Sequence, residues 1–147
     1  MFVVDTNVLV YAVDGDSEYH AKCRALLESW QRSASGWYLT WGICYEFLRV
    51  TTHSRILRSP WNLAESWQFL EALLSSPSVE LLIPSERHAE VAAEVFRETP
   101  ELAGNLLHDA TTAVLMREHG IHRIYTRDID FSRFRFLEVI DPLGKRN

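Results

Sequence analysis

The fold is decided by a short segment near the start of the sequence, Phe2-Val3-Val4 followed by Asp5-Thr6-Asn7. Three consecutive apolar residues are typical of a strand that is buried on both faces, as the strands of parallel sheets are. Asp and Thr are favoured N-cap residues, so we expect the chain to pass at Asp5 or Thr6 into a helix that continues from Val8 to Val13. A buried strand that leads directly into a helix is the opening unit of an α/β fold.

The rest of the sequence repeats this alternation. Further strands are expected at 37–40, 79–83, 122–126 and 137–140, and helices at 18–30, 41–52, 63–74, 87–98 and 106–119. Gly120 suits the left-handed position that ends the last of these helices, and the polar segment 127–132 is expected to be a loop. The alternation predicts an α/β domain with a mainly parallel central sheet. Because repeats, linkers and low-complexity stretches are absent from the sequence, we expect a single domain, 1–147.

The composition is that of a globular protein, with 47% apolar and 24% charged residues. The longest apolar runs, such as Val8 to Val13 and Val79 to Ile83, are too short to cross a bilayer, so no membrane association is expected. The first residues carry no signal-peptide pattern, and we expect a cytoplasmic protein. Cys23 and Cys44 each fall within a predicted helix, where we expect them to be small buried side chains.

The formal net charge of −5 argues at first against a nucleic-acid partner, because affinity for phosphate comes mainly from Lys and Arg. Acids that bind metal ions contribute to that total, however, and Lys22 and Lys145 are the only lysines among 15 cations. Arginine is the side chain best suited to bidentate contacts with phosphate. Arg49, Arg55 and Arg127 are therefore candidate RNA contacts, although arginines on a solvated surface would give the same composition.

Two acids fall on the apolar stripe of their predicted helices. Asp109 lies three residues after Leu106, and Glu46 lies three residues after Ile43. A carboxylate that faces inward is costly unless it is paired, hydrogen-bonded or bound to a metal ion. Structural alternatives remain open: Glu46 could pair with Arg49, and Asp109 could be an acid favoured by the helix dipole at the first turn.

Two further acids lie at the ends of predicted strands. Asp5 follows the strand 2–4 and Asp128 follows the strand 122–126. Open parallel sheets place their ligand crevices beyond the carboxyl ends of the strands, so these acids and the two helical ones could converge in one crevice. The alternatives are that Asp5 only caps its helix and that Asp128 and Asp130 are ordinary polar residues of a loop.

Carboxylates without His or Cys partners indicate a hard cation, Mg²⁺ or Mn²⁺, rather than zinc. Such a cation polarises a phosphate and lowers the pKa of an attacking water molecule. The acids therefore indicate hydrolysis of a phosphodiester or of a phosphate monoester, without choosing between the two.

Four motifs in this order resemble those of PIN-domain ribonucleases, and in particular the VapC-type toxins of bacterial toxin–antitoxin pairs. They are Asp5-Thr6-Asn7-Val8-Leu9, Tyr45-Glu46-Phe47-Leu48-Arg49-Val50, His108-Asp109-Ala110 and Thr126-Arg127-Asp128-Ile129-Asp130-Phe131. The resemblance spans the whole chain. It implies a PIN-like α/β/α fold with Asp5, Glu46, Asp109 and Asp128 as the catalytic acids.

The resemblance also implies how the site works. Asp5, Asp109 and Asp128 would bind the metal ion, with Asp130 joining or replacing Asp128. Thr6, Asn7 and Thr126 would support these acids. The family implies a Mg²⁺-dependent endoribonuclease, with Mn²⁺ as a substitute, that cleaves RNA, frequently tRNA or rRNA, and leaves a 5′-phosphate. It further implies a homodimer that is neutralised by a VapB-type antitoxin, whose tail occupies the active-site groove. The sequence shows no departure at the acid positions.

Other functions fit these residues less well. A phosphatase of the haloacid dehalogenase type needs a second Asp two residues after Asp5, where Asn7 stands, and a downstream Lys that this sequence does not offer. A phospho-receiver domain lacks its Lys for the same reason. A non-catalytic PIN-like module that binds RNA or a protein remains the alternative, and RNA cleavage in Mg²⁺ distinguishes the two.

Overall fold

A computed structural model describes residues 1–144, so the last three residues of the expected domain, Lys145 among them, lie outside the described part. Five strands form its centre: β1 (Val3–Val4), β2 (Trp37–Thr40), β3 (Val79–Leu82), β4 (Arg123–Tyr125) and β5 (Glu138–Ile140). Their spatial order is β3-β2-β1-β4-β5, and all four neighbouring pairs are parallel. The predicted α/β fold with a mainly parallel sheet is confirmed.

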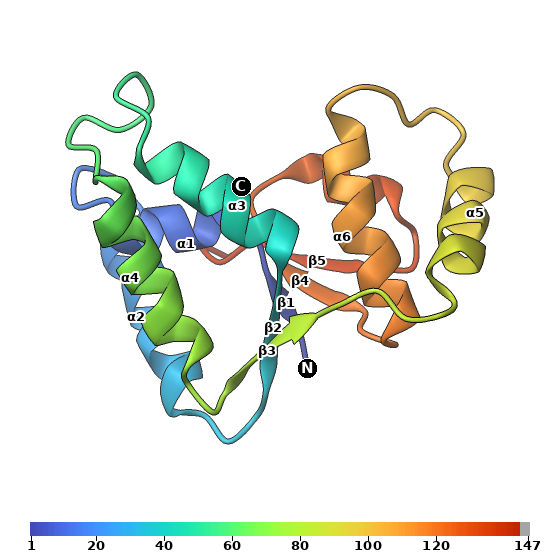
Figure 1. Ribbon diagram of the computed structural model, residues 1–147, viewed down its shortest axis with the longest axis horizontal. Coiled ribbons are helices and arrows are strands. Elements are labelled where there is room, and N and C mark those ends of the chain that lie inside the picture. The colour runs from blue at the N-terminus through green and yellow to red at the C-terminus, as the bar shows by residue number, and fades with distance from the viewer. Residues whose placement is uncertain (145–147) are drawn as a thin grey trace.

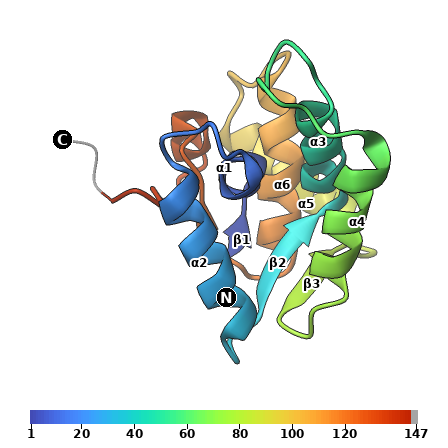
Figure 2. The ribbon, with the colours of Figure 1, turned by 90° about the vertical axis from the view of Figure 1, so that its left-hand side faces the viewer.

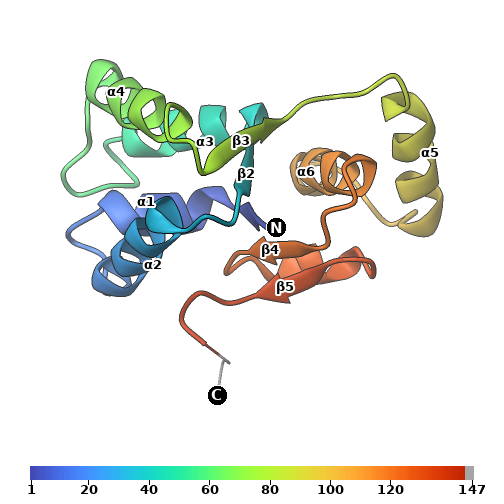
Figure 3. The ribbon, with the colours of Figure 1, turned by 90° about the horizontal axis from the view of Figure 1, so that it is seen from below.

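Helices flank this sheet on both sides. They are α1 (Thr6–Val13), α2 (His20–Arg32), α3 (Trp41–Thr51), α4 (Leu63–Leu74), α5 (His88–Glu98), α6 (Leu106–Glu118) and the 3-10 helix η1 (Ile129–Arg133). The helices α1, α2 and α4 gather on one side of the sheet and α5 and α6 on the other (Figures 1 and 3). Helix α3 touches α1, α4 and α6, so it links the two groups (Figure 2). None of the helices within residues 1–144 is long and apolar enough to span a membrane.

Strand β1 occupies the centre of the sheet although it has only two residues. Val3 and Val4 are fully buried, and the strand lies between β2 and β4. The chain continues from β1 to β2 and β3 on one side, and later adds β4 and β5 on the other side. Such a reversal of strand order is a topological switch point, where ligands bind beyond the carboxyl ends of the two strands. Asp5 and the residues after Tyr125 are therefore brought together at this edge.

Aromatic packing fixes α2 against the middle of the sheet. The Trp30 ring lies with its centroid 5.1 Å from that of Phe2 and 4.7 Å from that of Tyr125, next to the ends of β1 and β4. The thiols of Cys23 and Cys44 are free and buried, as expected.

The predicted loop 127–132 differs from the structure, which has the 3-10 helix η1 in this segment. The Asp128 carboxylate caps this helix by accepting a hydrogen bond from the backbone N–H of Asp130 at 2.9 Å. Phe131 and Phe134 are buried and anchor the helix to the core. Because polar residues surround these two aromatic residues in the sequence, the segment resembled a loop.

Gly120→Ala tests the predicted end of α6. Gly120 has φ +66° and open space around the position of a Cβ, so only the left-handed backbone resists a side chain. We expect the free energy of unfolding to fall by about 1 kcal/mol and the melting temperature by about 3 °C. Gly15→Ala is the matched control, because Gly15 has no positive φ and equal space. Equal losses for the two variants in thermal unfolding would contradict this explanation.

Candidate active site

The five acids singled out in the sequence share one pocket beside the carboxyl ends of β1 and β4. The pocket has a volume of about 760 Å³, and its lining includes Asp5, Glu46, Asp109, Asp128 and Asp130. Asp5 follows β1, Glu46 comes from α3, Asp109 from the first turn of α6, and the last two acids from the start of η1. The convergence that the sequence suggested thus occurs in the structure.

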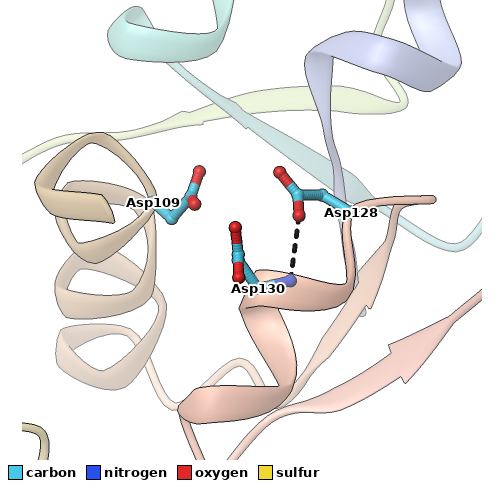
Figure 4. A group of neighbouring side chains, drawn as sticks. All are labelled: Asp109, Asp128 and Asp130. Atoms are coloured by element: carbon cyan, nitrogen blue, oxygen red, sulfur yellow. Dashed lines mark hydrogen bonds between the residues drawn. The ribbon is translucent and has the colours of Figure 1, made fainter. Parts of the chain in front are cut away.

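Three of these acids form a tighter group, which we call the three-acid cluster: Asp109, Asp128 and Asp130. One carboxylate oxygen from each lies within 4.8 Å of those of the other two. Figure 4 shows Asp109 pointing from α6 toward the two acids of the η1 turn. All three side chains are half-buried. An acid-only set at this spacing matches the ligand preference of a hard cation such as Mg²⁺.

Asp109 shows the electrostatic cost of this arrangement. Its pKa is raised from 3.8 to about 7, first because burial penalises the charged form and then because Asp128, Asp5 and Asp130 repel it. Near neutral pH, bringing the ionised form of Asp109 close to the other carboxylates is unfavourable unless a cation binds between them. The cluster therefore fits a divalent cation on chemical and electrostatic grounds.

Asp5 serves two purposes at once. Its Oδ1 accepts a hydrogen bond from the backbone N–H of Thr6 at 2.8 Å, so Asp5 caps α1. Its Oδ2 accepts from the Asn7 amide at 2.9 Å and from the Thr126 hydroxyl at 2.6 Å. Burial raises the pKa of Asp5 to about 6, although the hydrogen bonds from Thr126 and Thr6 act in the opposite direction. Asp5 therefore caps α1 and also lines the acidic pocket.

Thr126 connects the acids that follow β1 and β4. Besides donating to Asp5, its Oγ1 accepts from the Asn7 amide and from the backbone N–H of Asp128, each at 3.0 Å. The Thr126 side chain is 1% exposed. Thr6 acts elsewhere, since its hydroxyl donates to the Ile43 carbonyl at 3.3 Å and joins α1 to α3. Asn7 and Thr126 thus form side-chain hydrogen bonds to the acids of the pocket, whereas the Thr6 hydroxyl does not.

Glu46 lines the pocket but stands outside the three-acid cluster. Its carboxylate forms a bidentate pair with Arg49, with Oε1 2.7 Å from Nη2 and Oε2 2.9 Å from Nε. Hydrogen bonding to Arg49 lowers the pKa of Glu46. The expected inward orientation is found only in part, because the side chain lies at the edge of the apolar stripe and is half-buried. The alternative pairing with Arg49 is present as well.

The three predicted RNA-binding arginines have different surroundings. Arg49 lines the pocket, and Arg55 is exposed next to Ile56, which also lines it. Arg127 is not part of that lining. Its Nε lies 3.4 Å from Oδ1 of Asp141, and its guanidinium carbon lies 4.4 Å from the centre of the Tyr19 ring. This placement gives no support to Arg127 as an RNA contact and instead gives its side chain a role inside the protein.

Tyr19 and Asp141 were not identified from the sequence. Asp141 directly follows β5, so it repeats the arrangement of Asp5 after β1 and could have been noticed for that reason. Tyr19 precedes α2 and carries no comparable signal. His108, from the third motif, is exposed and also lines the pocket.

Comparisons with known proteins agree with this geometry. A family model described as PIN domain matches residues 2–137. The chain is 32% identical over 140 residues to Ribonuclease VapC48 of Mycobacterium tuberculosis, covering 95% of this chain and 96% of that protein.

Two solved structures share the fold. VapBC2 of Rickettsia felis, bound to a DNA fragment from its promoter, has a TM-score of 0.67 at 17% identity, covering 95% of this chain and 96% of that one. VapC20 of M. tuberculosis, a sarcin-ricin loop cleaving toxin, has a TM-score of 0.62 at 20% identity, covering 90% and 93%. The helices on both sides of a parallel sheet match the α/β/α fold of these structures.

The raised pKa values predict how stability depends on pH without divalent cations. Asp5 and Asp109 have pKa values of about 6 and 7 in the folded state, above 3.8, so the folded protein binds protons more tightly than the unfolded chain. Their stabilising contribution is complete below about pH 4 and is lost as the pH rises through 6 and 7. For Asp5 the change amounts to about 3 kcal/mol. Urea unfolding in EDTA should therefore give a lower unfolding free energy at pH 8 than at pH 5.

Mg²⁺ or Mn²⁺ should remove much of this dependence, because a cation replaces the protons and stabilises the protein most at pH 8. Asp109→Asn should weaken both the pH dependence and the response to cations. Glu90→Gln is the control, because Glu90 is an exposed acid on α5. Unfolding curves that are the same with and without cation would speak against the site.

Proposed function

Since the chain belongs to the PIN-domain family and to its VapC ribonucleases, we propose that the acidic pocket is the active site of a Mg²⁺-dependent endoribonuclease. The observation that carries this proposal is the three-acid cluster, whose carboxylate oxygens lie within 4.8 Å of one another. Ribonuclease activity follows from the family, and the cluster supports the choice of metal. Mn²⁺ would serve as a substitute because it prefers the same oxygen ligands.

The acids would have different roles, which follow from their positions in the pocket. Asp109, Asp128 and Asp130 would hold the cation, and Asp5 would support it from the end of β1. A bound Mg²⁺ supplies a Lewis acid that polarises the phosphate and makes water more acidic. Thr126 and Asn7 hold the Asp5 carboxylate in one orientation through their hydrogen bonds. Glu46, which Arg49 keeps ionised, would orient a water molecule from outside the cluster.

The substrate would be held by arginines at the rim of the pocket. Arg49 lines the pocket and Arg55 lies exposed beside it, so both can reach the phosphates of a bound strand. A tRNA or rRNA substrate is supported by the relative VapC20, which is a sarcin-ricin loop cleaving toxin. Cleavage would leave a 5′-phosphate.

The partners would be a VapB-type antitoxin and a second copy of this chain. VapBC2 of R. felis supports the first. Exposed aromatic side chains on α3 support the second: Trp41 is 39% and Tyr45 is 64% exposed, and their ring centroids lie 5.9 Å apart. Such residues are typical of protein interfaces. With RNA and an antitoxin as partners, the cytoplasm would be the place of action.

RNA cleavage tests the proposed function directly. The purified chain should cut total tRNA or rRNA in Mg²⁺ or Mn²⁺, and EDTA should abolish the cut. Asp109→Asn and Asp128→Asn should each lower the rate at least about 100-fold, because each removes charge from the cation site. Mapping the 5′ ends of the products identifies the cleavage site.

Glu90→Gln provides the control, since this acid is exposed on α5 and does not line the pocket. It should cleave like the wild type. A protein that binds RNA but cleaves none of these substrates, and whose binding is unchanged by Asp109→Asn, would instead be the non-catalytic binding module.

Inhibition by an antitoxin is a separate prediction. A VapB-type antitoxin, for which the gene immediately upstream is the first candidate, should form a complex with this chain. It should stop cleavage at equimolar amounts, because an antitoxin tail that fills the pocket excludes RNA. Gel filtration and the cleavage assay measure the two effects. A complex that cleaves RNA at the full rate would rule out occupation of the pocket.

A further inference from the structure

Arg127 lies between two residues of the site, Thr126 and Asp128, yet its side chain contacts other parts of the protein. The side chain is only 20% exposed, and that of Asp141 is 16% exposed. The Arg127 guanidinium lies over the Tyr19 ring and beside the Asp141 carboxylate. We call this arrangement the Arg127 clamp. It joins the turn after β4 to the start of α2 and to the end of β5.

The backbone of Arg127 is held from the side of the acids. Its N–H donates to Oδ1 of Asn7 at 3.2 Å, and the same Asn7 side chain donates to Asp5. The next residue, Asp128, donates its backbone N–H to Thr126 and accepts from the backbone N–H of Asp130. The turn that carries two of the three clustered acids is therefore fixed through its backbone on one side and through the Arg127 side chain on the other.

The clamp also reaches the wall of the pocket. The rings of Tyr19 and Tyr11 meet edge to face with centroids 5.0 Å apart, and Tyr11 lines the pocket from α1. Asp141 is itself positioned, because its Oδ1 accepts from the backbone N–H of Leu143 at 3.0 Å. Both surfaces that hold the guanidinium are thus anchored.

The charge of Arg127 is directed at partners outside the three-acid cluster. Its guanidinium faces the Asp141 carboxylate and the Tyr19 ring. We therefore expect Arg127 to act on the site through the position of the turn. This matters because the three clustered carboxylates repel one another and would move apart if the turn were free.

We propose that Arg127 is a positioning residue, whose clamp between Tyr19 and Asp141 holds the Asp128–Asp130 turn at the distance from Asp109 at which the three acids can share one divalent cation. This proposal rests on the proposed function. Mg²⁺ demands a nearly ideal set of ligand positions, so a small displacement of the turn would weaken binding. Residues that orient metal ligands change metal affinity about 10- to 100-fold when they are removed.

Mn²⁺ binding to the full chain is the primary test. In a titration followed by electron paramagnetic resonance, Arg127→Ala should raise the dissociation constant for Mn²⁺ at least about 10-fold. Arg127→Lys should not restore it, because lysine keeps the charge but neither stacks on Tyr19 nor offers a planar fork to Asp141. Arg123→Ala is the matched control: Arg123 lies on β4, four residues earlier, and forms an exposed pair with Glu138. It should bind Mn²⁺ like the wild type.

Cleavage kinetics supply a second readout. In Arg127→Ala the Mg²⁺ concentration for half-maximal cleavage should rise by the same factor, while KM for RNA at saturating Mg²⁺ stays unchanged. The melting temperature of each variant in EDTA shows whether the substitution destabilises the protein as a whole. If Arg127→Ala does not fold, Tyr19→Leu and Asp141→Asn carry the same test, since each removes one side of the clamp.

Several results would overturn the proposal. An unchanged Mn²⁺ dissociation constant together with a higher KM and a weaker salt dependence would make Arg127 an RNA contact. Restoration by Arg127→Lys would show that charge, not position, matters. A wild-type chain that binds Mn²⁺ but cleaves no RNA would contradict the proposed function alone, because the clamp is tested by the Mn²⁺ titration.

Discussion

Mutual repulsion among Asp109, Asp128 and Asp130 is the constraint on which the rest of this structure depends. Their carboxylate oxygens lie within 4.8 Å of one another, and the pKa of Asp109 rises to about 7 as a result of burial and of its acidic neighbours. Repulsion between the carboxylates disfavours such a group, so the fold has to hold it together. Helix α6 supplies one acid and the η1 turn supplies the other two, and each element is anchored elsewhere by apolar residues. Apolar packing in the core therefore supplies the free energy that keeps the acids together. A cation that binds to the acids stabilises the folded state further.

The topology explains why so small a strand as β1 can organise the site. Val3 and Val4 lie in the middle of the sheet, so the residue that follows them emerges at the switch point, next to the end of β4. The Thr126 hydroxyl then bonds to Asp5 across 121 positions of sequence. Because Thr126 also accepts from the backbone of Asp128, a single buried hydroxyl sets the relation between the first acid and the cluster.

The sequence predicted those features that depend on neighbouring residues. The alternation of strands and helices, the left-handed Gly120 and the acids at strand ends are all encoded within a few positions, and the structure has them. The partners of Arg127 could not be predicted in the same way, because Tyr19 lies 108 residues before it and no spacing links them.

The η1 helix was missed because its anchors are two aromatic residues within a polar segment. Glu46 shows a third reason: its inward position and its pairing with Arg49 seemed exclusive, but an acid at the edge of a helix stripe can have both.

The distribution of arginines resolves the apparent conflict between a net charge of −5 and an RNA substrate. Glu46 and Asp130, at the edges of the acidic group, each form an ion pair with an arginine three residues later on the same element. Within residues 1–144, neither Asp109 nor Asp128 has an ion pair with Lys or Arg. The negative charge is thus neutralised by arginines at the rim of the pocket. It is left uncompensated at the centre, where an arginine side chain would block a substrate. A divalent cation at the centre would complete the neutralisation and present positive charge to a phosphate. In such a site the overall charge of the chain says little about its affinity for RNA, because three of its 20 acids lie where a cation would cover them.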